Sequence, residues 1–152
     1  MAAVRWAEAT WSGDLTSGSG TIDYVSSGVF SRLPVAWESR TEEHGGRTSP
    51  EELLAMAHAS CFSMALSGAL GRAGTPPERL DVKATVTFAK AEAGWKVASS
   101  AIEVNGRVPG ASADDFQAAA EKARDGCPIS VALKGNVELS VTARLGETAE
   151  AR

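Results

Sequence analysis

The chain has few of the residues that most often bind metals or form disulfide frameworks. Among 152 residues there are two cysteines, Cys61 and Cys127, and two histidines, His44 and His58. The cysteines are far apart in the sequence, so they form neither a CxxC redox pair nor half of a zinc site, and two histidines add too few ligands to build one. We therefore expect no metal and no cofactor.

The chain also lacks an excess of positive charge. Fifteen Lys and Arg residues stand against 19 Asp and Glu residues, which gives a net charge of −4, and the basic residues are scattered. This charge pattern excludes neither catalysis nor small-molecule binding, but it disfavours nucleic acid and anionic membrane surfaces as partners. Residues 1–10 carry charges at Arg5 and Glu8, so a secretory signal is not predicted and we expect a cytoplasmic protein.

One long run has no formal charge, residues 53–71. It is long enough to span a bilayer, but its Ala, Ser, Gly and His content makes its transfer into lipid weak. We therefore predict no membrane span. A helix that is apolar on all sides is instead expected to be buried on all sides, and a single small domain can hardly surround it.

Hydrophobic periodicity, turn residues and capping patterns predict an α+β protein with antiparallel β-sheets packed around long central helices, in a single domain over residues 1–152. Ser49 is the expected N-cap of a helix from Pro50 to residues 71–74, with Glu52 closing a capping box. Ser112 is the expected N-cap of a helix that ends at Gly126. The expected strands are residues 3–11, 21–25, 33–39, 80–90, 95–108 and 136–143, with a loop at 41–48 and a short helix that starts at Cys127 and Pro128.

The two cysteines lie in different local contexts. Cys61 is in the middle of the uncharged helix, where a buried thiol is inert unless an Arg or Lys is placed beside it. Cys127 begins a new helix, where exposed N–H groups favour a thiolate. The alternative is that both are small buried hydrophobic residues, which spacing alone does not exclude.

Three motifs together resemble the OsmC/Ohr family of osmotically inducible and organic hydroperoxide resistance proteins. They are WESRTE at residues 37–42, SPEELLAMAHASCFSMAL at 49–66 and GCPIS at 126–130. The HASCF and CPIS segments are closer to the OsmC branch than to the Ohr branch. The resemblance implies a thiol-dependent peroxidase that works as an intertwined homodimer.

The resemblance also implies a role for each of four residues. Cys61 matches the peroxidatic cysteine, Cys127 the resolving cysteine, Arg40 the activating arginine, and Glu51 the carboxylate that holds this arginine. Such a site reduces an organic hydroperoxide to an alcohol through a sulfenic acid at Cys61 and an intramolecular disulfide. An external dithiol then reduces the disulfide, and the family suggests a dihydrolipoyl group on a lipoyl protein.

Helix geometry adds the expectation of a shared site. Glu51 and Cys61 are ten residues apart on one helix, which corresponds to about 15 Å at 1.5 Å per residue, and they face different sides. A two-fold partner whose helix runs antiparallel would bring Glu51 of one subunit near Cys61 of the other. We therefore expect a homodimer with two composite sites, which would also bury the uncharged helix.

The other candidate residues have simpler explanations. Arg47 competes with Arg40 but is expected to be a solvated loop residue. His58 is one helical turn before Cys61 and could be a base, although a hydrogen-bonded core histidine is the favoured interpretation. His44 is a loop residue. The alternative function is a non-catalytic stress protein that binds an apolar small molecule at the dimer interface, with both thiols inert.

Overall fold

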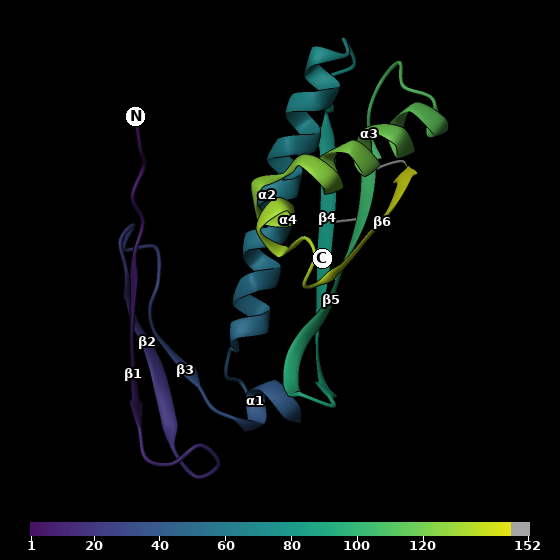
Figure 1. Cartoon of the computed structure of the whole chain (residues 1–152). Helices are drawn as coiled ribbons and strands as arrows, with labels where there is room; N and C mark the ends of the chain where they lie inside the picture. The colour runs from purple at the N-terminus through teal and green to yellow at the C-terminus, as the bar shows by residue number, and fades with distance from the viewer. Residues whose placement is uncertain (147–152) are drawn as a thin grey trace. The chain divides into compact units, whose positions relative to one another are not determined.

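A computed structural model describes residues 1–146 (Figure 1). They fall into two compact units, the first over Met1–Leu53 and the second from Leu54 onward. The predicted single domain extends to residue 152, so its last six residues lie outside the described part. Each unit has one three-stranded sheet. The α+β class predicted from the sequence is confirmed.

The first unit is an antiparallel sheet of order β1-β2-β3 followed by a one-turn helix and the start of α2. Its elements are β1 (Ala7–Ser12), β2 (Ser19–Val25), β3 (Ser31–Val35), α1 (Glu38–Thr41) and the first residues of α2 (Pro50–Arg72). Pro34 lies within β3, which is an edge strand where the missing N–H is tolerated.

The predicted third strand was wrong at its end, because β3 stops at Val35 and α1 follows. The reason is local hydrogen bonding by Ser39. Its hydroxyl lies 2.7 Å from the carbonyl oxygen of Ala36 and 2.8 Å from that of Thr48, and it accepts the N–H of Ala36 at 3.3 Å. Serine side chains that bond nearby backbone groups compete with a strand ladder in this way.

The start of α2 at Pro50 agrees with the prediction. Ser49 Oγ accepts the N–H of Glu52 at 3.1 Å, which is the N-cap bond. The Glu52 carboxylate accepts a bond from the hydroxyl of Thr48 at 2.8 Å. The predicted N-cap at Ser49 is confirmed, whereas the Glu52 side chain bonds to the Thr48 hydroxyl instead of closing the predicted capping box on the Ser49 N–H.

The second unit contains the rest of α2, a β-hairpin, two helices and a final strand. These are β4 (Arg79–Ala91), β5 (Gly94–Arg107), α3 (Ala113–Gly126), α4 (Pro128–Leu133) and β6 (Glu138–Leu145). The hairpin closes with Ala91 opposite Gly94, as predicted. Ser112 Oγ caps α3 by accepting the N–H of Asp115 at 3.1 Å.

The prediction of purely antiparallel sheets was wrong for β6, which pairs with β5 in parallel. The chain leaves the end of β5, passes through α3 and α4, and returns in the same direction, which is a βαβ crossover. Alternating apolar and polar residues are expected in either orientation, so the pattern of residues 136–143 carried no information on direction.

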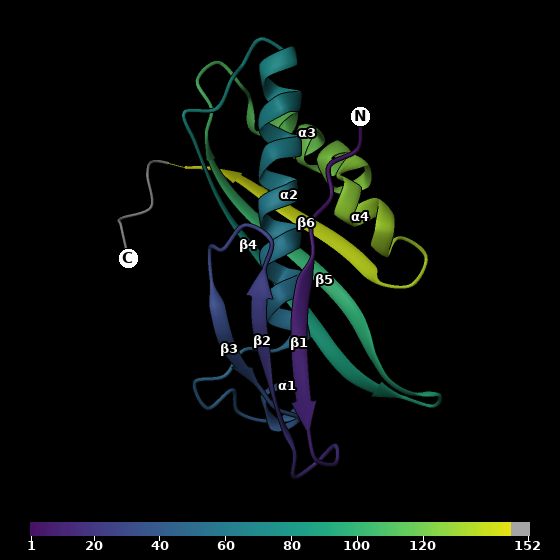
Figure 2. The same cartoon turned by 90° about the vertical axis from the view of Figure 1, so that its left-hand side faces the viewer.

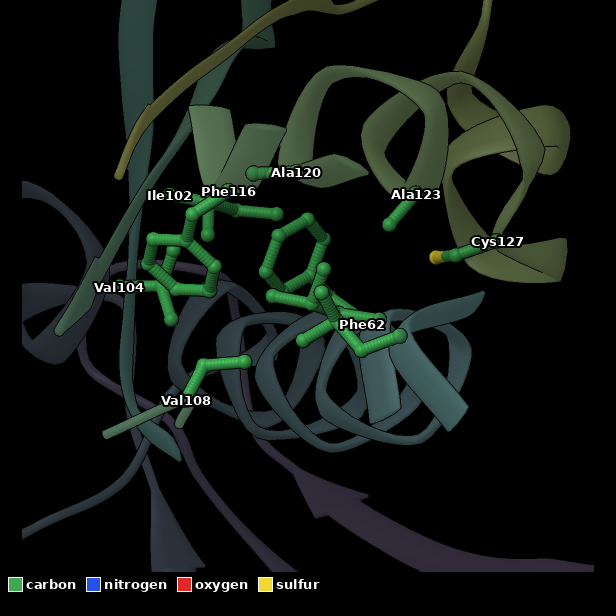
Figure 3. Close-up of a cluster of buried hydrophobic side chains, with 10 residues drawn as sticks. Phe62, Ile102, Val104, Val108, Phe116, Ala120, Ala123 and Cys127 are labelled. Atoms are coloured by element: carbon green, nitrogen blue, oxygen red, sulfur yellow. The ribbon is translucent and has the colours of Figure 1, made fainter. Parts of the chain in front are cut away.

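The core of the second unit lies between α2, the sheet and α3 (Figures 2 and 3). Each element contributes one face to this core. Successive buried residues are three or four positions apart on the helices and two positions apart on β5. The buried side chains are Phe62, Leu66 and Leu70 from α2, Ile102 and Val104 from β5, Val108 just after β5, Phe116, Ala120 and Ala123 from α3, and Cys127.

By length and hydropathy alone, α2 could cross a membrane. Its Phe62, Leu66 and Leu70 are instead packed in this core. Other apolar side chains of α2 are exposed, with Met56 at 52% and Met64 at 70% of their full surface. Among the described residues, α2 thus has one side packed in the core of the second unit and other apolar side chains that are exposed.

Candidate functional site

The Arg40 guanidinium and the Glu51 carboxylate form a two-pronged ion pair within the first unit. Arg40 Nη2 donates to Glu51 Oε1 at 2.7 Å, and Nε lies 3.2 Å from each carboxylate oxygen. The Arg40 guanidinium carbon is also 5.7 Å from the centroid of the Trp37 ring. An arginine held by a carboxylate on one edge and by an aromatic face has little freedom to reorient.

Local structure explains why these residues meet. Arg40 is on α1, and Glu51 is in the first turn of α2, after the loop at residues 42–49. The Thr48 N–H donates to the carbonyl of Pro34 at 3.0 Å, and Ser39 bonds to the carbonyl of Thr48. These bonds return the end of the loop to the start of α1. The Glu51 side chain is 8% exposed and that of Arg40 is 29% exposed.

A cavity of about 290 Å³ lies beside Arg40 within the same unit. Its walls are almost entirely apolar, and Arg40 is the charged residue among them. The lining residues are Trp11, Leu15, Val35, Ala36, Trp37, Arg40 and Pro50. The cavity thus combines an apolar wall with one fixed cation.

Arg47, the competing arginine, lies apart from this pair. Its guanidinium is 4.0 Å from the carboxylate of Glu38, and both side chains are 39% exposed. An exposed ion pair at this distance contributes little to stability. The structure therefore agrees with the expectation that Arg47 is a loop residue.

The two cysteines come together in the second unit. Both are free thiols; Cys127 is fully buried and Cys61 is partly buried. Cys61 packs against the hydrophobic cluster that contains Cys127, and the Cys127 thiol is near enough to raise the pKa of the Cys61 thiol. Figure 3 shows the sulfur of Cys127 turned toward this cluster.

The surroundings of Cys61 within this unit oppose its ionisation. Burial raises the pKa of the Cys61 thiol above its ordinary value, the N–H of Ile129 lowers it, and the Cys127 thiol raises it again. The net direction is upward. A reactive Cys61 thiolate therefore requires a positive charge that these neighbours do not supply.

His58 is a buried, hydrogen-bonded core residue, as predicted. It is fully buried, its Nδ1 lies 2.7 Å from Ser100 Oγ, and its Nε2 lies 2.8 Å from Ser130 Oγ. Ser130 Oγ is in turn 3.3 Å from Cys127 Sγ, and the Ser130 N–H donates to the same sulfur at 3.4 Å. Burial lowers the pKa of His58.

Sequence reasoning missed Ser100 and Ser130 as partners of His58. A signal for Ser100 existed, because it shares the inward alternation of β5 with Ile102 and Val104. A serine on an apolar face needs a polar partner. Ser130 gave a weaker signal, since it is three residues after the cap residue Cys127 and only the helix boundary identifies it.

Comparison with known proteins gives the family. The sequence model described as "OsmC-like protein" matches residues 43–142, which include Glu51 and both cysteines. The chain belongs to the OsmC-like family. The resemblance found in the sequence motifs is thereby confirmed.

Named relatives in this family refer to peroxide chemistry. The chain is 42% identical to the peroxiredoxin OsmC of Escherichia coli K12 over 132 residues, which covers 87% of this chain and 91% of the relative. It is 34% identical to the organic hydroperoxide resistance protein OhrA of Bacillus subtilis 168, over 62% of this chain and 65% of OhrA.

Solved structures support the fold. The crystal structure of the organic hydroperoxide resistance protein OhrB of Bacillus subtilis superimposes with a TM-score of 0.70 at 24% identity, covering 91% of this chain and 98% of OhrB. The crystal structure of an organic hydroperoxide resistance protein from Elizabethkingia anophelis gives a TM-score of 0.71 at 24% identity. The match covers 96% of this chain and 100% of the Elizabethkingia protein. The OsmC/Ohr fold is therefore shared.

The neutral burial of His58 predicts a pH-dependent stability. The unfolded chain binds a proton at His58 near pH 6.5, the ordinary pKa, whereas the folded chain does so only at lower pH. At pH values between the pKa of His58 in the folded state and that in the unfolded state, the unfolded state therefore binds more protons. The free energy of unfolding falls as the pH drops below about 6.5. His58→Gln should remove up to about 1.4 kcal/mol per pH unit of this dependence.

Urea denaturation at about pH 7.5 and 5.5 measures the effect. His44→Gln is the matched control, because His44 is in an exposed loop. It should retain the wild-type difference between the two pH values. Equal pH dependence in wild type and His58→Gln would contradict the prediction.

Proposed function

We propose that this protein is a thiol-dependent peroxidase that reduces organic hydroperoxides to alcohols in defence against oxidative or osmotic stress. The peroxide forms a sulfenic acid at Cys61, Cys127 closes a disulfide with it, and an external dithiol, such as a lipoyl protein, restores both thiols. We place this activity in the cytoplasm. The peroxide-related names of the relatives support the reaction class.

The observation that carries the proposal is the proximity of two free thiols from distant parts of the sequence, since Cys61 packs against the cluster that contains Cys127. A sulfenic acid at Cys61 would form beside a second thiol already in place to condense with it. This rapid condensation protects the sulfur from oxidation to the sulfinic acid.

Arg40 is the cation that we assign to Cys61. The reaction needs a thiolate, and it needs stabilisation of the negative charge that develops on the departing oxygen. A guanidinium can serve both, with one edge held by Glu51. Because burial raises the pKa of Cys61, an outside positive charge is a requirement of the mechanism.

We further propose that the working unit is a homodimer in which Arg40 and Glu51 of one subunit act on Cys61 of the other. The exposed apolar side of α2, with Met56 and Met64, supports this assembly. A second copy of the same helix would cover that side and remove its apolar surface from water, which is favourable by about 25 cal/mol per Å².

The apolar cavity beside Arg40 favours an organic hydroperoxide over hydrogen peroxide. Arg40 would face the peroxide oxygens, and the alkyl or aryl group would occupy the cavity. Each buried methylene contributes about 0.8 kcal/mol that hydrogen peroxide cannot gain. Three such groups correspond to a preference of roughly fiftyfold in kcat/KM if the binding is kept in the transition state.

The two sulfurs should be separable by mutation. Cys61→Ser should abolish consumption of cumene hydroperoxide, whereas Cys127→Ser should form the sulfenic acid at Cys61 without closing a disulfide. Mass spectrometry of each variant after one equivalent of peroxide distinguishes these products. Continued turnover by Cys61→Ser, or resistance of both wild-type thiols to peroxide, would overturn the proposed function.

Substrate preference should depend on the cavity wall. Leu15 lines the cavity but is 56% exposed, so Leu15→Ser should fold normally. This change should lower kcat/KM for cumene hydroperoxide by about tenfold and leave that for hydrogen peroxide nearly unchanged. Val29→Ser, at an exposed position outside the cavity, is the control. An equal loss on both substrates would contradict the cavity assignment.

Composite sites predict complementation between inactive chains. A heterodimer of Cys61→Ser and Glu51→Ala chains should contain one intact site, so co-refolding the two should restore activity. Mixing Cys61→Ser with Cys127→Ser chains should restore no disulfide turnover, because both thiols come from one chain. Light scattering confirms dimers. Absence of activity in verified heterodimers of the first pair would exclude a shared site.

A further inference from the structure

A continuous row of buried polar atoms ends at the sulfur of Cys127. It runs from Ser100 Oγ to His58 Nδ1 at 2.7 Å, from His58 Nε2 to Ser130 Oγ at 2.8 Å, and from Ser130 Oγ to Cys127 Sγ at 3.3 Å. The four residues are between 0% and 1% exposed. They come from β5, α2, α4 and the residue that caps α4.

Packing alone gives no reason for this row. Burying a histidine and two hydroxyls is favourable only if every polar atom is paired, and apolar side chains of equal size would fill the same volume without that condition. The neighbouring positions of the core are apolar: Phe62 follows on α2, and Ile102 and Val104 follow on the inward face of β5. A polar row in this setting points to a chemical task.

The burial of Cys127 defines that task. To attack a sulfenic acid, the Cys127 thiol must lose its proton, since the thiolate is the nucleophile. The sulfur is 0% exposed, so water is not in position to take that proton. Ser130 Oγ is the hydroxyl in contact with the sulfur, and behind it lies the imidazole of His58.

We propose that Ser130 and His58 form a proton relay that activates the resolving cysteine, Cys127, for disulfide closure. This inference rests on the proposed peroxidase function and deepens it. Ser130 touches the reacting sulfur directly. His58 acts through Ser130, and Ser100 fixes the orientation of the imidazole.

The same positions of the non-hydrogen atoms allow a complete set of hydrogen bonds both before and after the proton transfer. Before it, His58 Nδ1–H donates to Ser100, Ser130 O–H donates to His58 Nε2, and the thiol donates to Ser130. After it, His58 carries protons on both nitrogens, Nε2–H donates to Ser130, and Ser130 O–H donates to the thiolate. The Ser130 N–H, 3.4 Å from the sulfur, stabilises the negative charge as well.

The step balances in atoms and electrons. The thiolate of Cys127 attacks the sulfur of the Cys61 sulfenic acid, an S–S bond forms, and the S–O bond breaks. The sulfenic sulfur is reduced, the Cys127 sulfur is oxidised, and hydroxide leaves. The hydroxide is protonated by solvent and His58 returns its proton to solvent, so the net products are one disulfide and one water.

The inward positions of β5 beside Ser100 are the apolar Ile102 and Val104, and on the cysteine side the row meets the thiols of Cys127 and Cys61. On the α4 side, Ser130 borders a surface pocket that Arg124, Asp125 and Lys134 also line, and among the described residues no hydrogen bond joins these charged groups to the imidazole. Burial lowers the pKa of His58, so the imidazole is neutral across the physiological range and can take a proton.

The experiment separates the two chemical steps in single turnover. One equivalent of cumene hydroperoxide is added to the full-length protein, and peroxide consumption and disulfide closure are followed separately by rapid quench and mass spectrometry. His58→Gln keeps a polar partner for Ser130 but cannot accept a proton, and Ser130→Ala removes the bridging hydroxyl. Both should consume peroxide at the wild-type rate and close the disulfide about a hundredfold more slowly.

The pH profile of closure distinguishes a relay from a structural role. Between about pH 7 and 8 the wild-type closure rate should change little, because burial lowers the pKa of His58 below its ordinary value and the imidazole is neutral there. In His58→Gln the rate should rise about tenfold per pH unit, because the thiolate must then form by direct loss of a proton to hydroxide. A structural defect would lower the rate without changing this slope.

Ser63→Ala is the matched control. Ser63 is on α2 near Cys61, and its hydroxyl donates to the carbonyl of Ala59 at 2.7 Å. It should close the disulfide as the wild type does. When a second equivalent of peroxide is added, sulfinic acid at Cys61 should accumulate in His58→Gln and Ser130→Ala, but not in this control.

The possible failures are distinguishable. If wild type leaves cumene hydroperoxide unconsumed, the proposed function fails and the relay fails with it. If wild type closes the disulfide and both His58→Gln and Ser130→Ala close it with the wild-type rate and pH profile, only the relay is overturned. Ser130→Ala decides the matter if His58→Gln does not fold.

Discussion

The α2 helix places Cys61 in a stretch of residues 53–71 that carries no formal charge. A thiol there ionises only when positive charge is brought to it, because burial favours the neutral form. The rest of the proposed chemistry follows from this constraint. It explains why the proposed cation is an arginine and not His58, because burial keeps the His58 imidazole neutral. It also explains why a carboxylate must hold that arginine in place.

The structure keeps the cation and the thiols on different parts of the chain. Arg40 and Glu51 are fixed to each other in the first unit, whereas Cys61 and Cys127 meet in the second. Each pair is ordered by its own local contacts: Ser39 and the loop end for the first, and Ser130 for the second. Because each pair is ordered without the other, this arrangement is compatible with the proposed homodimer, in which the Arg40–Glu51 pair of one subunit meets the cysteines of the other.

Sequence reasoning predicted most elements because their boundaries are marked by short-range signals. Ser49 with Pro50, Ser112, Gly126 and the turn at residues 91–94 each act within a few residues. The wrong predictions concern features that depend on contacts distant in the sequence, or on side-chain hydrogen bonds that compete with strand pairing. The parallel pairing of β6 depends on where the crossover returns the chain, and the end of β3 depends on Ser39 bonding to Thr48.

The site was predictable to a similar extent. The motifs identified both cysteines, Arg40 and Glu51, and the structure shows the Arg40–Glu51 ion pair and Cys61 packed against the cluster that contains Cys127. Their catalytic roles remain proposals. The partners of His58 were not found, because Ser100 and Ser130 are 42 and 72 residues away from it and only the tertiary fold brings them together.

The loop between α1 and α2 is held at both ends, and at its tip His44 accepts the N–H of Gly46 at Nδ1 and that of Arg47 at its carbonyl oxygen. Ser39 and the Arg40–Glu51 pair secure its two bases, while Gly45 and Gly46 at the tip adopt positive φ angles of 55° and 74°. Any other residue at these two positions would be strained, so the turn that returns the chain from α1 to Glu51 depends on two residues that have no side chain. The cost of bringing the carboxylate back to the guanidinium is therefore met by the backbone of the loop and not by its side chains.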